Sequence, residues 1–145
     1  MIAPMTRTLL SFGHGFSARA LSRILIPQGW RVIGTTRSED KAQALRDEGV
    51  EPLIWPGTDM TEAIAQATHM LISTAPGEDG DPVLAEWRDT IAARADRFDW
   101  VGYLSTTGVY GDHQGGWVDE ETGLTPGTKR GKQRVKAEGE WWMLA

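Results

Sequence analysis

Short apolar runs alternate with stretches of helical periodicity along this chain. The apolar runs predict five strands, over residues 8–12, 30–36, 50–55, 69–74 and 100–105. Apolar residues at helical spacing follow the first four runs, and they predict helices over residues 16–26, 38–48, 59–67 and 81–95. A last helix is predicted over residues 131–144, after a glycine-rich and acidic loop at residues 106–128.

This alternation indicates an α/β fold. Parallel strands joined by right-handed helical crossovers fit half, or slightly more, of a Rossmann-type doubly wound sheet with helices on both faces. The first helix is predicted to bury one apolar face, formed by Phe16, Ala20, Leu21, Ile24 and Leu25. A ligand in such a fold binds at the carboxyl ends of the strands, near the switch in strand order.

The segment Gly13–Ala18 reads G-x-G-x-x-A between a predicted strand and a predicted helix. Gly13 would permit the tight turn, Gly15 would let the backbone approach a pyrophosphate, and Ala18 would let helix and strand pack closely. The helix N-terminus would supply N–H groups and a positive dipole end to the anion. The sequence therefore predicts cofactor contacts from Gly13, His14, Gly15, Phe16, Ser17 and Ala18. The alternative is a plain glycine turn, and we expect the His14 side chain to face either solvent or the cofactor.

The end of the second strand favours NADP over NAD. An NAD site usually has Asp or Glu about 20 residues after the glycines, bound to the ribose 2′-hydroxyl. This chain has Thr36, Arg37 and Ser38 there, and an arginine can bind a 2′-phosphate with a two-pronged fork. The alternative is a solvated arginine at a strand end. Further cofactor contacts are expected at the end of the fourth strand, from Thr74, Ala75 and Pro76.

Hydroxyl residues and a VYG motif follow the fifth strand, in the segment YLSTTGVYG at residues 103–111. This segment resembles the S-S-x-x-VYG segment of extended short-chain dehydrogenases/reductases, the group that includes nucleotide-sugar epimerases and dehydratases. The glycine loop and Thr125-Pro126 fit the same family, so the resemblance runs from about Thr8 to the C-terminus.

The resemblance implies a catalytic role for three positions. A Ser or Thr at the position of Thr106 binds the reacting oxygen of the substrate in that family. The Tyr and Lys of the family's Y-x-x-x-K motif correspond to Arg130 and Arg134, which is an atypical pair. A guanidinium stays protonated, so Arg130 is a poor proton donor or acceptor but could bind an anion. Arg134 could keep a ribose contact, and the family makes the other nearby phenol, Tyr110, structural.

Two functions follow as alternatives. The first is an NAD(P)-dependent oxidoreductase or epimerase-like enzyme that acts on a carbonyl, a hydroxyl or a nucleotide sugar as its small-molecule substrate. The second is a non-catalytic dinucleotide-binding module with a role in redox sensing or assembly. Arg130 in the tyrosine position favours the second, and the two recognisable motifs favour the first.

Composition narrows the remaining classes. The net charge of −5 disfavours nucleic-acid binding, and the absence of cysteine excludes disulfides and thiol catalysis. The three histidines are far apart, so we expect no metal site. No apolar run approaches the roughly 18 residues of a membrane helix, and the N-terminus lacks the pattern of a signal peptide. We therefore expect a cytoplasmic protein without a membrane partner.

The length of 145 residues suits a single domain over residues 1–145. Members of the resembled family are considerably longer, and their C-terminal region shapes the substrate pocket. We therefore expect this chain to correspond to the N-terminal part of that architecture, without the substrate region. An open sheet edge and an uncovered last helix would then predict poor stability or a homo-oligomer.

Overall fold

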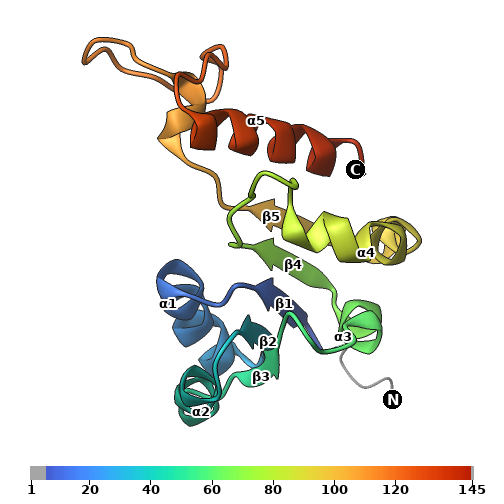
Figure 1. The fold of residues 1–145 in the computed structure, drawn as a ribbon. Coiled ribbons are helices and arrows are strands. Elements are labelled where there is room, and N and C mark those ends of the chain that lie inside the picture. The colour runs from blue at the N-terminus through green and yellow to red at the C-terminus, as the bar shows by residue number, and fades with distance from the viewer. Residues whose placement is uncertain (1–5, 145) are drawn as a thin grey trace. The chain divides into compact units, whose positions relative to one another are not determined.

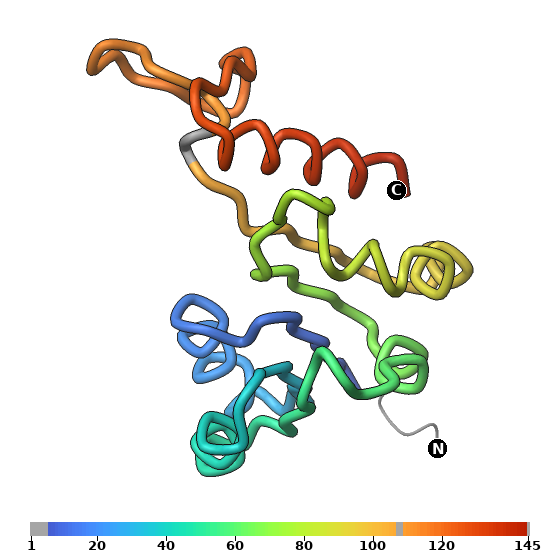
Figure 2. The backbone as a smooth tube through the Cα atoms, in the orientation of Figure 1, coloured from blue at the N-terminus to red at the C-terminus, as the bar shows by residue number. Residues whose placement is uncertain are grey.

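A five-stranded sheet lies at the centre of the chain (Figures 1 and 2). The computed structural model describes residues 6–144, apart from the side chains of residues 107 and 108. The strand order is β3-β2-β1-β4-β5, and the strands are β1 (Thr8–Phe12), β2 (Arg31–Thr36), β3 (Glu51–Ile54), β4 (His69–Ile72) and β5 (Trp100–Tyr103). The five predicted strands and the doubly wound α/β class are thus confirmed, with the last three strands shorter than expected.

The strand order reverses direction between β1 and β4. β1 pairs in parallel with β2 on one side and with β4 on the other, while β2 pairs in parallel with β3. The backbone N–H of Ser73 continues the β1–β4 pairing by donating to the carbonyl oxygen of Phe12 at 2.9 Å. This is the switch point at which ligands bind in doubly wound folds.

The described residues group into two compact units. One unit holds residues 6–73 and 89–102, and the other holds residues 74–88 and 103–144. The first unit contains β1 to β4 with three helices: α1 (Phe16–Leu25), α2 (Glu39–Asp47) and α3 (Thr61–Gln66). In it, α1 and α2 lie on one face of the sheet and α3 lies on the other (Figure 1).

The core of the first unit explains its local structure. All five residues of β1 are buried, as expected for a parallel strand that is covered on both faces. Between the sheet and the two helices on one face lies an apolar cluster of Leu9, Ala18, Val32, Leu45, Val50 and Leu71. The buried Ala18 lets α1 approach β1, which confirms the packing role predicted for this position.

The predicted inner face of α1 is wrong for three of its five residues. Phe16 is 92% exposed and Ile24 is 60% exposed, and Ala20 is also exposed. The helix buries Ala18 and Ser22 instead, with Leu21 and Leu25 packed partly against the core. The buried face of α1 therefore differs from the predicted one and includes the polar residue Ser22. Ser22 can be buried because its hydroxyl donates a hydrogen bond to the carbonyl oxygen of Arg19.

The second unit is built around α5 (Lys129–Trp142) and the first part of α4 (Pro82–Ala92). Thr128 caps α5 by accepting a hydrogen bond from the N–H of Gly131, so the helix begins two residues before the predicted start. Val83, Leu84 and Ile91 of α4 are buried.

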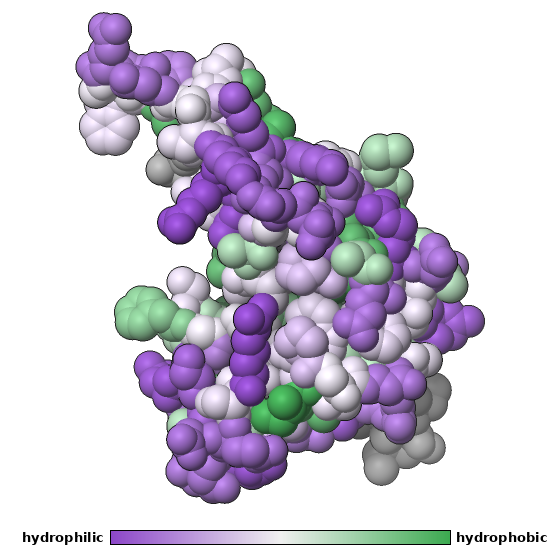
Figure 3. Space-filling model, viewed as in Figure 1, coloured by the Kyte–Doolittle hydropathy of each residue, from purple (hydrophilic) through white to green (hydrophobic). Residues whose placement is uncertain are grey.

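Three short 3₁₀ turns complete the chain, at η1 (Ile26–Gln28), η2 (Ala95–Arg97) and η3 (Thr107–Tyr110). The predicted extension of the fourth helix to residue 95 is therefore wrong, since Ala95 lies in η2. Hydrophilic side chains cover most of the face seen in Figure 3. Within residues 6–144, no helix has both the length and the apolar character that a membrane crossing requires.

Candidate functional site

The glycine loop connects β1 to α1 and is held by Thr35 of β2. The N–H of Gly13 donates to the Thr35 hydroxyl at 2.7 Å, and the N–H of His14 donates to the Thr35 carbonyl oxygen at 2.9 Å. Gly13 has a φ of 77°, a conformation that L side chains rarely adopt. The predicted role of Gly13 in a tight turn is confirmed. Sequence analysis missed Thr35, whose only signal was a hydroxyl residue inside a buried strand.

Gly15 has no packing reason to be glycine. Its φ of −99° is open to any residue, and a Cβ at this position would have its nearest neighbour, the carbonyl oxygen of Gly13, at 3.8 Å. A Cβ on Gly15 would therefore clash with none of the described residues beyond its two chain neighbours. A glycine in such a place suits the close approach of another molecule to the backbone.

The N-terminus of α1 begins at this open position. Gly15 is its N-cap, no side chain of the described residues caps the helix, and its first turn contains no acidic residue. The N–H groups of the first helical turn have no partner inside the helix itself. Phe16 and Ser17, which form the start of this turn, are exposed. Together with the dipole, this arrangement suits an anion.

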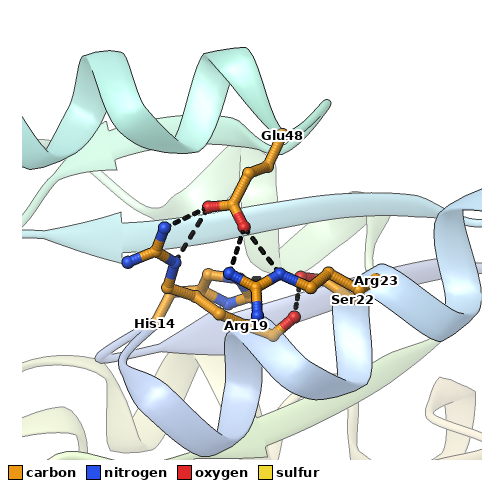
Figure 4. A network of polar contacts seen from close by, with 5 residues as sticks. All are labelled: His14, Arg19, Ser22, Arg23 and Glu48. Carbon is orange, nitrogen blue, oxygen red and sulfur yellow. Dashed lines mark hydrogen bonds and ion pairs between the residues drawn. The ribbon is translucent and has the colours of Figure 1, made fainter.

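The His14 side chain lies inside the protein, so the expectation that it faces solvent is wrong. Only 6% of the residue is exposed, and its Nε2 lies 3.2 Å from the Ser22 hydroxyl (Figure 4). Burial lowers the pKa of His14 to about 4, although the nearby carboxylate of Glu48 acts in the opposite direction. The imidazole is therefore neutral at physiological pH.

An ion-pair network joins α1 to the end of α2 on the same side of the sheet (Figure 4). Glu48 accepts hydrogen bonds from Arg19 Nε at 2.8 Å and from Arg23 Nε at 2.9 Å, one on each carboxylate oxygen. The hydrogen bond from Arg19 is the main cause that lowers the pKa of Glu48. The network fixes the helix that carries the glycine loop.

The end of β2 presents Arg37 to solvent. Thr36 is buried, and Ser38 caps α2 by accepting a hydrogen bond from the N–H of Lys41 at 3.2 Å. Within the part of the chain that the structure describes, no hydrogen bond or ion pair holds the Arg37 guanidinium, so it is available to a ligand. The carboxylates that follow, Glu39 and Asp40, lie in the first turn of α2, where they complement the helix dipole.

The predicted contacts at the end of β4 belong to the second unit. Thr74 is half-buried, and its hydroxyl is a buried atom without a hydrogen-bond partner among the described residues. Ala75 is exposed and Pro76 is half-buried. The turn then closes with a bridge between Gly77 and Gly80.

Arg134 holds the end of β5 within the second unit. Its guanidinium donates to the carbonyl oxygen of Leu104 at 2.6 Å, and its central carbon lies 5.9 Å from the centre of the Tyr103 ring. Leu104 lies two residues before Thr106, which is exposed. Arg130 is exposed at the first turn of α5, and no contact among the described residues holds its guanidinium. The structure thus brings Arg134 to the end of β5.

Tyr103 is half-buried with a buried hydroxyl oxygen, and sequence analysis did not single it out. Burial raises its pKa to about 12, although the charge of Arg134 acts in the opposite direction. Its hydroxyl has no hydrogen-bond partner among the described residues. Tyr103 belongs to the quoted YLSTTGVYG segment, but strand residues of this kind usually serve packing, so the sequence carried no separate signal.

The VYG motif has a structural explanation. Gly111 has a φ of 77°, and a Cβ there would lie 1.8 Å from the carbonyl oxygen of Thr125. The Thr125 hydroxyl donates to the carbonyl oxygen of Tyr110 at 2.7 Å, and Val109 is buried. Two segments that carried the family resemblance, VYG and Thr125-Pro126, therefore contact each other.

No group of three potential metal ligands occurs within the residues that the structure describes.

Solved enzymes of the epimerase, dehydratase and reductase type share this architecture. One example is the Bordetella bronchiseptica enzyme WbmG, solved in complex with NAD and UDP, with a TM-score of 0.70 and 19% identity over 97% of this chain and 50% of that chain. At this identity the likeness concerns the fold. The chain therefore shares the fold of these enzymes, in agreement with the fold that the sequence resemblance predicts.

Two further proteins are similar in sequence as well. Protein YeeZ of Escherichia coli K12 is 31% identical over 90% of this chain and 51% of its own length. A conserved protein of unknown function from Silicibacter pomeroyi DSS is 60% identical, with a TM-score of 0.90 over 96% of this chain and 49% of that chain. The chain thus spans about half the length of both. No protein-family model matches it.

Proposed function

We propose that this chain binds a nicotinamide dinucleotide and forms the cofactor-binding part of an oxidoreductase or epimerase-like enzyme. The observation that carries the proposal is Gly15. This glycine is the N-cap of α1, no side chain of the described residues caps that helix, and a Cβ on Gly15 would lie 3.8 Å from the nearest described atom outside its two chain neighbours. Neither backbone strain nor packing accounts for it, whereas the approach of a pyrophosphate does.

Each residue of the glycine loop would have its own role in binding the pyrophosphate. Gly13 makes the turn, and the N–H groups of Phe16 and Ser17 at the start of α1 would donate to the pyrophosphate oxygens. Hydrogen bonds from the Gly13 and His14 N–H groups to Thr35 hold the loop in place, so the anion meets preorganised N–H donors. Further contacts from Ser17, Thr74, Ala75 and Pro76 are part of the proposal.

NADP is the proposed preference over NAD. The exposed guanidinium of Arg37 follows β2, where the adenosine ribose of a dinucleotide would lie in this fold, and the carboxylates Glu39 and Asp40 lie in the first turn of α2. A guanidinium can donate two hydrogen bonds to a 2′-phosphate, which a Lys could not do with the same geometry. Ser38 and Thr36 complete this proposed subsite.

The catalytic residues are proposed at Thr106, Arg130 and Arg134. A bound nicotinamide would supply or accept a hydride. Thr106 would donate its hydroxyl to the reacting oxygen of a carbonyl, hydroxyl or nucleotide-sugar substrate. The unengaged guanidinium of Arg130 would bind an anionic group of that substrate rather than exchange a proton with it.

A non-catalytic dinucleotide-binding module is the second candidate, and Arg134 favours it. The family's lysine position is occupied here by a guanidinium that binds the Leu104 carbonyl oxygen at 2.6 Å. A guanidinium that donates to the backbone of Leu104, directly after β5, has fewer donors left for a cofactor ribose. This module would serve redox sensing or assembly.

Calorimetric titration of the protein with NADPH and with NADH tests the proposal. Saturable binding of either cofactor is expected, with NADPH bound more tightly. The absence of saturable binding to both would overturn it. Oxidation of NADPH with a panel of carbonyl and nucleotide-sugar substrates then separates the enzyme from the non-catalytic module.

A further inference from the structure

The His14 side chain occupies a niche beneath the glycine loop. Its backbone lies between the two loop glycines, while its ring extends inward to the second turn of α1, where Nε2 meets the Ser22 hydroxyl at 3.2 Å (Figure 4). The Ser22 hydroxyl donates its own hydrogen to the Arg19 carbonyl oxygen at 3.0 Å. Ser22 must therefore accept from His14, which assigns the proton of the neutral ring to Nε2.

Gly34 makes the room for this ring. A Cβ on Gly34 would lie 2.8 Å from both Cβ and Cγ of His14, and 3.1 Å from Cγ1 of Val50. Gly34 lies inside β2, where a glycine weakens the strand and often marks the close approach of another group. Its φ is not in the left-handed region, so the backbone does not demand a glycine. His14 is the group that approaches.

We propose that His14 is a positioning residue for dinucleotide binding, which fixes the Gly13–Gly15 loop against β2 and α1 in a niche that Gly34 keeps open. This inference rests on the proposed function, because it assumes that the loop receives the pyrophosphate. The His14 N–H anchors the loop to the Thr35 carbonyl oxygen, and the His14 ring anchors the same residue to Ser22. The loop is thereby held on both β2 and α1, so the N–H donors at the start of α1 keep their orientation toward the pyrophosphate.

The charged groups around the ring support this role. On α1, Arg19 and Arg23 point to Glu48, which follows α2, and the three charges are paired with one another. On β2, Gly34 is the uncharged residue whose missing Cβ would meet the Cβ and Cγ of His14. Because burial lowers the pKa of His14 to about 4, the ring stays neutral near pH 7 and needs no counter-ion.

Four variants test the proposal: His14→Ala, His14→Gln, Gly34→Ala and the double variant His14→Ala/Gly34→Ala. Gln keeps an N–H at a reach similar to that of Nε2, so it should still donate to Ser22. The matched control is His69→Ala, a half-buried histidine on β4 whose Nδ1 contacts Thr68. Each variant is titrated with NADPH and with adenosine 2′-monophosphate, which lacks the pyrophosphate, and its thermal midpoint is measured.

His14→Ala should weaken NADPH binding by about tenfold or more, the effect of losing roughly 1.4 kcal/mol of binding free energy. Its affinity for adenosine 2′-monophosphate should stay unchanged, and His14→Gln should restore most of the NADPH affinity. Gly34→Ala should weaken NADPH binding less in the His14→Ala background than in the wild-type background, since its methyl group then meets only the remaining Cβ of residue 14 and no ring. His69→Ala should leave both affinities unchanged.

Equal NADPH affinity of His14→Ala and the wild type would overturn the proposal. It would also be overturned if Gly34→Ala had the same effect in both backgrounds, because the His14 ring would then not be the group that the added methyl group displaces. If the wild type binds neither NADPH nor NADH, the proposed function fails instead. Amide hydrogen exchange still tests the positioning in that case: the Gly13 and residue-14 N–H groups should exchange faster in His14→Ala, and unchanged exchange would refute it.

Discussion

The indole Nε1 of Trp141 donates a hydrogen bond to Asp81 Oδ2 at 3.0 Å, across 60 residues of sequence. The other carboxylate oxygen of Asp81 accepts from the N–H groups of Val83 at 2.9 Å and Leu84 at 3.0 Å, and so caps α4. Asp81 is 2% exposed, and Trp141 is 8% exposed. One buried carboxylate therefore joins the start of α4 to the end of α5.

Trp141→Phe should destabilise the protein by about 1.5–3 kcal/mol, the range for a hydrogen bond to a charged group. Asp81→Ala should cost more, because it removes the helix cap and leaves the buried indole N–H without an acceptor. Urea unfolding followed by circular dichroism measures both changes.

Trp142→Phe is the matched control for this pair. Trp142 is the next residue on α5, and 78% of it is exposed. Its replacement should change the free energy of unfolding by less than about 0.5 kcal/mol, as is usual for surface substitutions. Equal changes in the free energy of unfolding at Trp141 and Trp142 would contradict a stabilising role of the hydrogen bond between Trp141 and Asp81.

The strands were predictable because parallel strands that are covered on both faces are continuous apolar runs. The buried face of α1 was not predictable from apolar residues alone. Phe16 and Ile24 are apolar but exposed, whereas Ser22 is polar but buried, since a local hydrogen bond satisfies its hydroxyl. Hydrophobic periodicity cannot distinguish a satisfied polar residue from a solvated one.

The motifs of the candidate site could be predicted from the sequence, but the tertiary contacts that hold its residues in place could not. Gly13 and Gly15 could be recognised because their spacing carries a mechanism. The burial of the His14 side chain depends on Gly34 of β2, and the hydrogen bond between Asp81 and Trp141 joins residues that are 60 positions apart in the sequence. Such pairs leave no local pattern, so a single sequence does not reveal them.

Gly15→Val should abolish cofactor binding without lowering the stability of the free protein. The φ of −99° accepts a side chain, and among the described residues beyond the two chain neighbours the nearest atom to the Cβ position is the carbonyl oxygen of Gly13 at 3.8 Å, so neither strain nor a clash is expected. The side chain would displace the pyrophosphate from the N–H groups of α1. Thermal unfolding with and without NADPH measures this, because a bound ligand raises the midpoint.

Gly123→Val is the control for Gly15→Val. Gly123 lies in the acidic loop, and a Cβ there would meet no atom within 4 Å. This variant should show the wild-type rise in thermal midpoint when NADPH is added. If Gly15→Val also keeps that rise, the glycine loop is only a turn, and the proposed dinucleotide site is wrong.

Arg37→Asp should reverse the cofactor preference. NADPH affinity should fall by about 1.5–3 kcal/mol, because the fork onto the 2′-phosphate is lost and a like charge replaces it. NADH affinity should hold or rise, since a carboxylate can accept hydrogen bonds from a ribose diol. Calorimetric titration of both cofactors measures the change, with the exposed Arg46→Asp of α2 as the control. A wild type that prefers NADH, or an equal loss for both cofactors, would contradict the role of Arg37.

The stability of the protein should fall as the pH drops from about 6.5 toward 4, in part because of His14. Its pKa is about 4 in the folded protein, against an ordinary value of 6.5 that applies when the chain unfolds. Between these values the unfolded chain binds a proton that the folded protein does not, so acid favours unfolding. The stabilisation is complete above the unfolded pKa, and about 2 kcal/mol of it should be lost at pH 5 relative to pH 8.

Urea unfolding at pH 8 and at pH 5 measures this loss, with His14→Gln as the comparison. Glutamine does not titrate, so the variant should lose less stability over the same interval. His69 also has a pKa lowered by burial, but it is present in both proteins and its contribution cancels. The carboxylates with lowered pKa values, Glu48 and Glu51, cancel for the same reason. An identical pH dependence of the wild type and His14→Gln would mean that the folded protein accepts a proton on His14 as readily as the unfolded chain, which is incompatible with a buried neutral ring.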